Sequence, residues 1–101
     1  MTIKQFAKAL LENLKINPTE EKLFIVELLI KEKKVRKVIL QELLRQRNMP
    51  DPQIKNLLQS LNKKEVIELT SKEGIDFIQL TNQATQELTT VEVNAFFQRK
   101  I

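Results

Sequence analysis

Residues 50–61, which read PDPQIKNLLQSL, carry side chains whose type and spacing suit hydrogen bonding to another molecule. Apolar residues recur there every three or four positions, which predicts a helix with one inward face. The outward positions carry amide and ammonium groups: Gln53, Lys55, Asn56 and Gln59. An Asn or Gln amide can pair with the edge of adenine, and Lys can bond to guanine or to phosphate. These residues are candidate DNA contacts; the alternative is an ordinary solvated surface in a Gln-rich chain.

Positive charge is concentrated in the middle of the chain. Residues 31–64 hold ten Lys or Arg and three Asp or Glu, whereas the whole chain has a net charge of only +4. An uneven distribution of this kind favours an anionic partner. The run KEKKVRK supplies candidates for phosphate contacts that do not depend on base sequence: Lys33, Lys34, Arg36 and Lys37. A solvated helix end, whose cations complement the helix dipole, would explain the same run.

The composition excludes several kinds of chemistry. The chain has no Cys and no His, so thiol catalysis, disulfides, zinc fingers and imidazole acid–base catalysis have no residues to perform them. Paired carboxylates at an interpretable spacing and a Gly-rich phosphate loop are also missing from the sequence. We therefore expect no enzymatic activity, no cofactor and no bound metal.

The sequence also bears on location. Its start, MTIKQFAKALLENLKI, is amphipathic and has no secretory apolar region or cleavage site. The longest apolar run, Leu23 to Ile30, is interrupted by Glu27 and is too short to span a bilayer. We expect a soluble cytoplasmic protein with no membrane partner.

The candidate contacts must be positioned by a small helical framework. The chain of 101 residues with 42% hydrophobic content suits one domain with one core. Residues 2–15 have the apolar spacing of a one-faced helix. A second helix is predicted to open at Asn17 as the cap, with Pro18 in the first position and Glu20 as the capping-box partner. Its segment LFIVELLI is apolar nearly all round, which places it at the centre of the core, and a break is expected near Lys34.

Two further helices follow. The first begins at Val35 and ends in RQRN, where Pro50 biases Met49 away from helical angles. The second is expected to be capped by Asp51, with Pro52 in its first position. Its inward residues are Ile54, Leu57, Leu58 and Leu61.

The pattern then changes from a helical to an alternating period. Residues 66–70 and 76–80 alternate and predict a β-hairpin. The only glycine of the chain, Gly74, lies between them, where a turn would require a positive φ. A last helical stretch follows Thr81, and Thr89-Thr90 is the point at which it could break.

This order of elements resembles a winged helix-turn-helix domain over residues 18–90. The specific part is Val38 to Thr81, where VILQELLRQRN, MPD and PQIKNLLQSLNKKEVIEL are similar to a positioning helix, a turn, and a recognition helix with the first wing strand. The segment IDFIQLT is similar to the second wing strand. The family often has Gly where Glu65 stands, and Ala and Gly around the turn, where this chain has Leu44 and Asn48.

The resemblance implies a mainly α fold with a small β-hairpin (α+β), in a single domain over residues 1–101. Its parts would be an N-terminal helix over residues 1–16, a winged-helix core over 18–81 and a C-terminal helix over 82–101. It also implies a dimeric transcriptional regulator that binds double-stranded DNA sequence-specifically, with helix 51–64 in the major groove. Gln53, Lys55, Asn56 and Gln59 fall at the family's base-contacting positions. Ser60 and Lys63 lie nearer the phosphates, and Lys72 resembles the wing residue at the minor groove.

The terminal helices carry more apolar residues than a minimal three-helix core requires. We expect them to form a homodimer, although they could instead cover their own domain. The residues expected at the dimer interface are Ile3, Phe6, Leu10, Leu14, Leu88, Val91, Phe96 and Phe97. A second hypothesis is a winged helix that binds a protein partner in a larger assembly and does not bind DNA. The modest net charge and the acidic Glu73 and Asp76 beside the wing suit that alternative.

Overall fold

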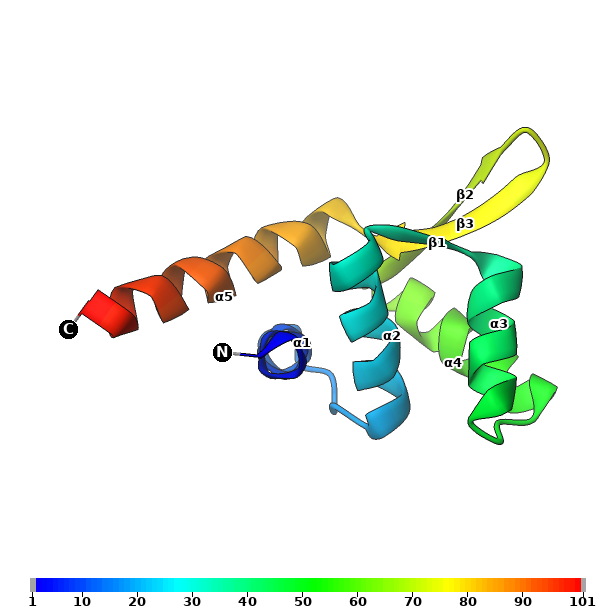
Figure 1. The fold of residues 1–101 in the computed structure, drawn as a ribbon, viewed down its shortest axis with the longest axis horizontal. Coiled ribbons are helices and arrows are strands. Elements are labelled where there is room, and N and C mark those ends of the chain that lie inside the picture. The colour runs from blue at the N-terminus through cyan, green and yellow to red at the C-terminus, as the bar shows by residue number, and fades with distance from the viewer. Residues whose placement is uncertain (1, 101) are drawn as a thin grey trace.

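The structure, a computed structural model, describes residues 2–100 and, within them, the side chains of residues 2–98 (Figure 1). It is mainly α-helical with a small antiparallel sheet, as the sequence predicts. The elements in chain order are α1 (Ile3–Asn13), α2 (Glu20–Glu32), β1 (Lys34–Arg36), α3 (Lys37–Gln46), α4 (Asp51–Lys63), β2 (Ile67–Lys72), β3 (Ile75–Leu80) and α5 (Asn82–Lys100).

One cluster of buried apolar side chains draws on all five helices and on the hairpin. Among the described residues no polar or charged side chain is buried. Leu10, Ile25, Leu40 and Leu61 are fully buried and come from four different helices. None of the described helices has both the length and the apolar character needed to cross a membrane.

The N-terminus of α1 is capped by two reciprocal hydrogen bonds. The Thr2 hydroxyl accepts from the Gln5 N–H (3.1 Å), and the Gln5 side chain accepts from the Thr2 N–H (2.8 Å), which makes a reciprocal capping box.

The predicted start of α2 is wrong. Thr19 is the N-cap, because its hydroxyl accepts from the Lys22 N–H (3.4 Å). Asn17 and Pro18 therefore precede the helix. Glu20 does not complete a capping box; it forms an exposed ion pair with Lys4 of α1 at 3.5 Å.

The helix α2 is central, as expected, with Leu23, Ile25, Val26 and Leu29 buried. It ends at Glu32, and Lys33 has φ 71° and ψ −55°, close to the strained geometry of a γ-turn. The chain then forms the three-residue strand β1, so the prediction that a helix begins at Val35 is wrong, and α3 begins at Lys37. Three residues are too few for an alternating pattern to be recognised.

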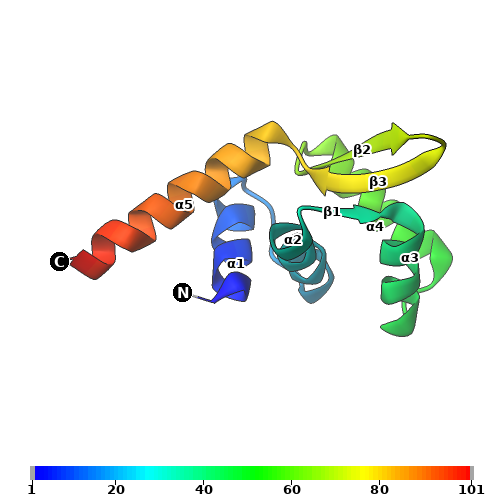
Figure 2. The ribbon, with the colours of Figure 1, turned by 45° about the horizontal axis from the view of Figure 1, so that its top comes forward.

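The sheet has the strand order β1-β3-β2, with both pairs antiparallel. The predicted hairpin is present. Lys72 pairs with Ile75 across a two-residue turn, in which Glu73 and Gly74 have φ 55° and 79°. Positive φ at both turn residues is what the preferred type I′ hairpin turn requires. Figures 1 and 2 show the hairpin projecting from the helices.

The register divides the sheet residues between two faces. Val35, Ile78 and Leu69 align across the three strands, and Val35 and Ile78 belong to the core. Because side chains alternate along a strand, their sequence neighbours point to the opposite side. We call that side the outer sheet face.

The helix α4 begins one residue earlier than predicted, so Pro52 is in the second helical position and not in the first. The N-cap of α4 is Pro50, and no side chain caps this helix. Asp51 is in the first helical position, and its carboxylate accepts from the Arg45 Nε at 2.8 Å. The inward face of α4 is as predicted, with Ile54, Leu58 and Leu61 buried.

The last helix, α5, runs without a break. Thr89 and Thr90 stay helical, and their hydroxyls donate to the carbonyls of Thr85 and Gln86 (3.1 and 3.2 Å). At its start, the Thr81 hydroxyl accepts from the Ala84 N–H (3.1 Å) and donates to the Glu65 carbonyl. The helix lies beside α1 and extends past it, away from the hairpin (Figure 2).

Candidate nucleic-acid interface

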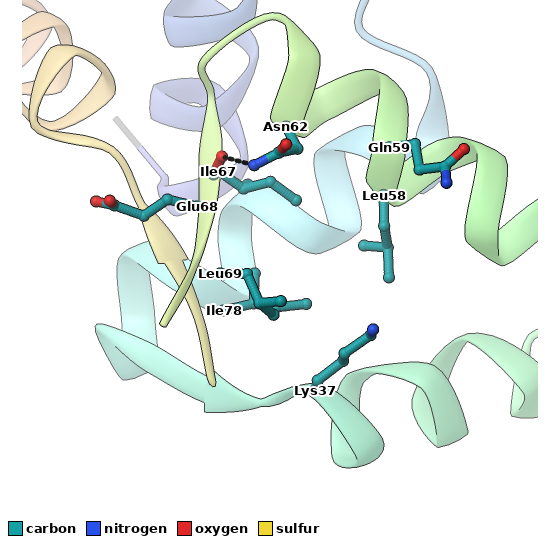
Figure 3. Close-up of a pocket in the computed structure, with 8 residues that line it drawn as sticks. All are labelled: Lys37, Leu58, Gln59, Asn62, Ile67, Glu68, Leu69 and Ile78. Carbon is teal, nitrogen blue, oxygen red and sulfur yellow. Dashed lines mark hydrogen bonds between the residues drawn. The ribbon is translucent and has the colours of Figure 1, made fainter. Parts of the chain in front are cut away.

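A hollow of about 170 Å³ lies between α4, β2 and the start of α3 (Figure 3). Its floor is apolar, and the half-exposed Leu69 lies over it. The Lys37 ammonium extends into the hollow toward Leu58, whereas the Glu68 carboxylate points away. Asn62 donates to the Ile67 carbonyl (3.2 Å) and so ties α4 to β2. The lining residues are Lys37, Leu58, Gln59, Asn62, Ile67, Glu68, Leu69 and Ile78.

A groove of about 350 Å³ continues from this hollow between α3 and α4. The two share Lys37, Leu58 and Gln59. The remaining lining residues of the groove are Gln41, Arg45, Asp51, Ile54 and Lys55. We call the hollow and the groove together the concave surface. It presents amide and ammonium groups above apolar side chains, which suits a hydrogen-bonding anionic partner.

The predicted contacts on α4 do not all face this surface. Lys55 and Gln59 line it, but helix geometry places Gln53 about 160° and Ser60 about 140° around the axis from Lys55. Asn56 and Lys63 lie between the side of α4 that carries Lys55 and Gln59 and the side that carries Gln53 and Ser60. They are on the side of the helix that faces furthest outward. The structure therefore brings Lys55 and Gln59 together with Lys37 and turns Gln53 and Ser60 away.

The predicted basic cluster is also divided. Lys37 lies in the hollow, whereas Lys34 lies on the outer sheet face with its Nζ 4.7 Å from the centre of the Phe77 ring. Arg36 is two residues along β1 and shares that face. Lys33 lines a separate pocket beside α5. Lys72 is on the outer sheet face near the hairpin turn.

Arg45 lines the groove, but its guanidinium is paired with two carboxylates. Its guanidinium donates to Asp51 (2.8 Å) and to Glu42 (3.3 Å). The hydrogen bond to Asp51, followed by that to Glu42, raises the pKa of Arg45 above its ordinary value. Arg47 lies elsewhere, 4.4 Å from the centre of the Phe24 ring.

Gln41 and Asn62 line this surface and are not among the predicted contacts. Asp51 was predicted as a cap, and its pairing with Arg45 was not predicted. Gln41 and Arg45 follow Lys37 at four-residue steps, so they form a stripe on α3. That stripe could have been found if the start of α3 at Lys37 had been known.

The predicted dimer residues fall into two groups. Leu10, Leu88 and Val91 are buried by their own chain, and Phe6 and Leu14 are half-buried. Ile3, Phe96 and Phe97 are exposed, at 40%, 56% and 60%. The Phe96 and Phe97 rings meet edge to face, with centres 6.0 Å apart. Val93, which is 45% exposed, lies four residues before Phe97 and was missed.

The described residues contain no group of three or more Asp or Glu that could hold a metal ion. The chain matches no family model, and no curated protein or solved structure is similar to it.

Proposed function

We propose that this chain is a winged helix-turn-helix protein that binds double-stranded DNA in the cytoplasm as a transcriptional regulator. The concave surface is the observation that carries the proposal. There Lys37, Lys55 and Gln59, from two helices that meet at a tight turn, flank one groove beside a projecting hairpin. Residues of α4 and of the hairpin line one hollow. In a helix-turn-helix the second helix enters the major groove, and the sequence resemblance assigns the hairpin as the wing beside it.

The backbone supports the fold assignment at two places where the sequence departs from the family. Asn48 and Glu65 both have positive φ, at 65° and 61°. Glycine adopts this region without strain, and Asn is one of the few other residues that visit it routinely. Positions at which the family often has glycine thus keep a conformation that favours glycine, although the residues differ.

The proposal narrows the predicted contacts. Lys37 and Lys55 bind phosphates, Gln59 and Asn56 face base edges, and Gln53 and Ser60 contribute little because they lie on the far flank of α4. In the same proposal two copies pair through the exposed side of α5.

The test is a titration of labelled duplex DNA at low salt. Lys37→Gln should weaken binding to every duplex about equally, whereas Asn56→Ala should reduce the discrimination between a selected site and random DNA. Lys8→Gln on α1, an exposed residue away from the concave surface, is the matched charge control. If random duplex DNA is not bound at low salt, the proposal is wrong.

The alternative is a winged helix that docks a protein. It is favoured by one observation: Leu69 is 50% exposed above the apolar floor of the hollow. Under this alternative, Leu69→Ser should abolish the partner complex, and Lys37→Gln should leave it nearly unchanged.

A further inference from the structure

The outer sheet face is a second surface with a distinct composition. Two contacts confirm which residues share it: Lys34 lies over the Phe77 ring, and Gln79 donates to Glu68 at 3.3 Å. The register adds Arg36 beside Phe77, and Lys72 beside Ile75.

This face is open to solvent. Lys34, Arg36, Lys72 and Ile75 are exposed, and Phe77 is half-buried. No residue of β1, β2 or β3 on this face is buried, whereas the opposite face contributes Ile67 and Ile78 to the core.

The charge of the outer sheet face is positive and not neutralised internally. Lys34, Arg36 and Lys72 form none of the ion pairs among the described residues, which join only Lys4 to Glu20 and Arg45 to Glu42 and Asp51. The single carboxylate of this face, Glu68, is hydrogen-bonded to Gln79.

An aromatic ring surrounded by cations on an open sheet matches one class of ligand in particular. Unpaired bases stack on aromatic side chains while Lys and Arg bind the phosphates between them. Bases in a duplex are already stacked on their neighbours, and unstacking one costs free energy, so a ring on a sheet surface takes up an unpaired base more readily than a paired one. We propose that the outer sheet face binds single-stranded nucleic acid, with a base on Phe77 and phosphates on Lys34, Arg36 and Lys72.

Lys34 has two roles in this arrangement. In the free protein its ammonium covers the Phe77 ring at 4.7 Å. An exposed cation–π contact of this kind is weak, and stacking of a base on the ring is stronger. An incoming base therefore displaces the ammonium, which then binds a phosphate next to that base.

The second surface is separate from the concave surface. The hollow is lined by Leu69 and Ile78 from the inner face of the sheet, and Phe77 is on the opposite face. Substitutions of the cations on one surface therefore leave the cations of the other surface in place, so the two surfaces can be tested separately.

The experiment measures fluorescence anisotropy with labelled oligothymidylate of about 15 nucleotides, and separately with random duplex DNA. The triple variant Lys34→Gln, Arg36→Gln, Lys72→Gln is compared with Lys37→Gln, Lys55→Gln, Lys63→Gln, which removes the same charge from the α3–α4 side. Arg36 is the N-cap of α3 but makes no side-chain capping bond, so glutamine there removes no cap.

We expect the first triple to weaken oligothymidylate binding by about tenfold or more at low salt, and the second to weaken it much less. Duplex binding should show the reverse order. Phe77→Leu, which keeps an apolar side chain but removes the ring, should weaken oligothymidylate binding several-fold. Circular dichroism of each variant reports whether the fold is retained.

The proposal is overturned if oligothymidylate is not bound, or if the two triples weaken its binding equally. It is also overturned if the first triple affects only binding to anionic lipid vesicles, which would identify the face as a membrane-binding surface. A failure of duplex binding alone would contradict the function proposed above and leave this inference standing.

Discussion

Asp51 removes a positive charge from the concave surface by binding Arg45 across the turn between α3 and α4. The guanidinium is held by two carboxylates, at 2.8 Å from Asp51 and 3.3 Å from Glu42. The hydrogen bond to Asp51, and then that to Glu42, raises the pKa of Arg45 above its ordinary value, so the guanidinium stays charged at physiological pH. In the proposed complex with DNA, this pairing would keep Arg45 from binding a phosphate.

Asp51→Asn should strengthen binding to duplex DNA. The substitution removes one negative charge from the groove and leaves Glu42 as the only carboxylate paired with Arg45. Arg45 then competes better for a phosphate, so the salt dependence of binding should steepen by up to about one phosphate contact. Stability should change little, because exposed ion pairs contribute little. Anisotropy titrations over a range of salt concentrations measure both quantities. Glu21→Gln on α2, which removes an exposed carboxylate away from the groove, should change neither; a variant that binds no more tightly than the parent would show that Arg45 faces no phosphate.

The helices and strands show that the hydrophobic periods of the sequence predicted the elements better than the capping residues predicted their ends. The periods of residues 2–15, 51–64 and 66–80 predicted two helices and the hairpin, because each period repeats often enough to be recognised. The caps of α2 and α4 were predicted wrongly, because Asn17, Thr19, Pro50 and Asp51 lie within one or two residues of each helix start and several of them are plausible caps.

The short strand β1 explains why the candidate site was only partly predictable. The basic run was interpreted as one cluster, which holds only if its residues share a face. Because Lys34, Val35 and Arg36 form a strand, Val35 enters the core and the two cations point to the outer sheet face. Lys37 begins a helix and turns to the other side. The basic residues are divided between two faces because β1 pairs with β3. Since β3 is distant in sequence, no local sequence pattern could predict this division.

Lys33→Gly should stabilise the fold by about 1 kcal/mol. Lys33 joins α2 to β1 at φ 71° and ψ −55°, a region that costs about 1–3 kcal/mol for a residue with a side chain. Glycine removes that strain but adds about 0.5–1 kcal/mol of conformational entropy to the unfolded chain. Urea denaturation followed by circular dichroism measures the difference. Lys31→Gly, in the last turn of α2, should instead destabilise by about 1 kcal/mol, and equal effects of the two substitutions would exclude strain at Lys33.

The whole molecule is elongated, with extents of 46 × 30 × 21 Å. One side of α5 is used by the chain itself, where Ala84, Leu88 and Val91 are buried. Val93 and Phe97 are one helical turn apart on another side and are 45% and 60% exposed. Apolar residues arranged in this way suit a self-complementary contact about a two-fold axis.

Phe97→Glu should convert a dimer into a monomer without unfolding it. A carboxylate at this position would be buried against its symmetry mate, and an unpaired buried charge is strongly unfavourable. Size-exclusion chromatography with light scattering gives the mass, and circular dichroism the fold. Gln83→Glu, at the exposed start of α5, adds the same charge and should leave the mass unchanged. A parent protein that is monomeric at high concentration would contradict the dimer.

The Thr81 hydroxyl group links the start of α5 to the residues that follow α4. Thr81 caps α5 at the Ala84 N–H and holds the Glu65 carbonyl directly after α4, while its own N–H donates to the carbonyl of Val66 (3.0 Å). The direction in which α5 runs is thus fixed relative to the end of α4, and not relative to the tip of the hairpin. In a dimer formed through α5, the distance between the two α4 helices would depend on this link. A tilt of α4 in one copy would therefore change the orientation of α4 in the other copy.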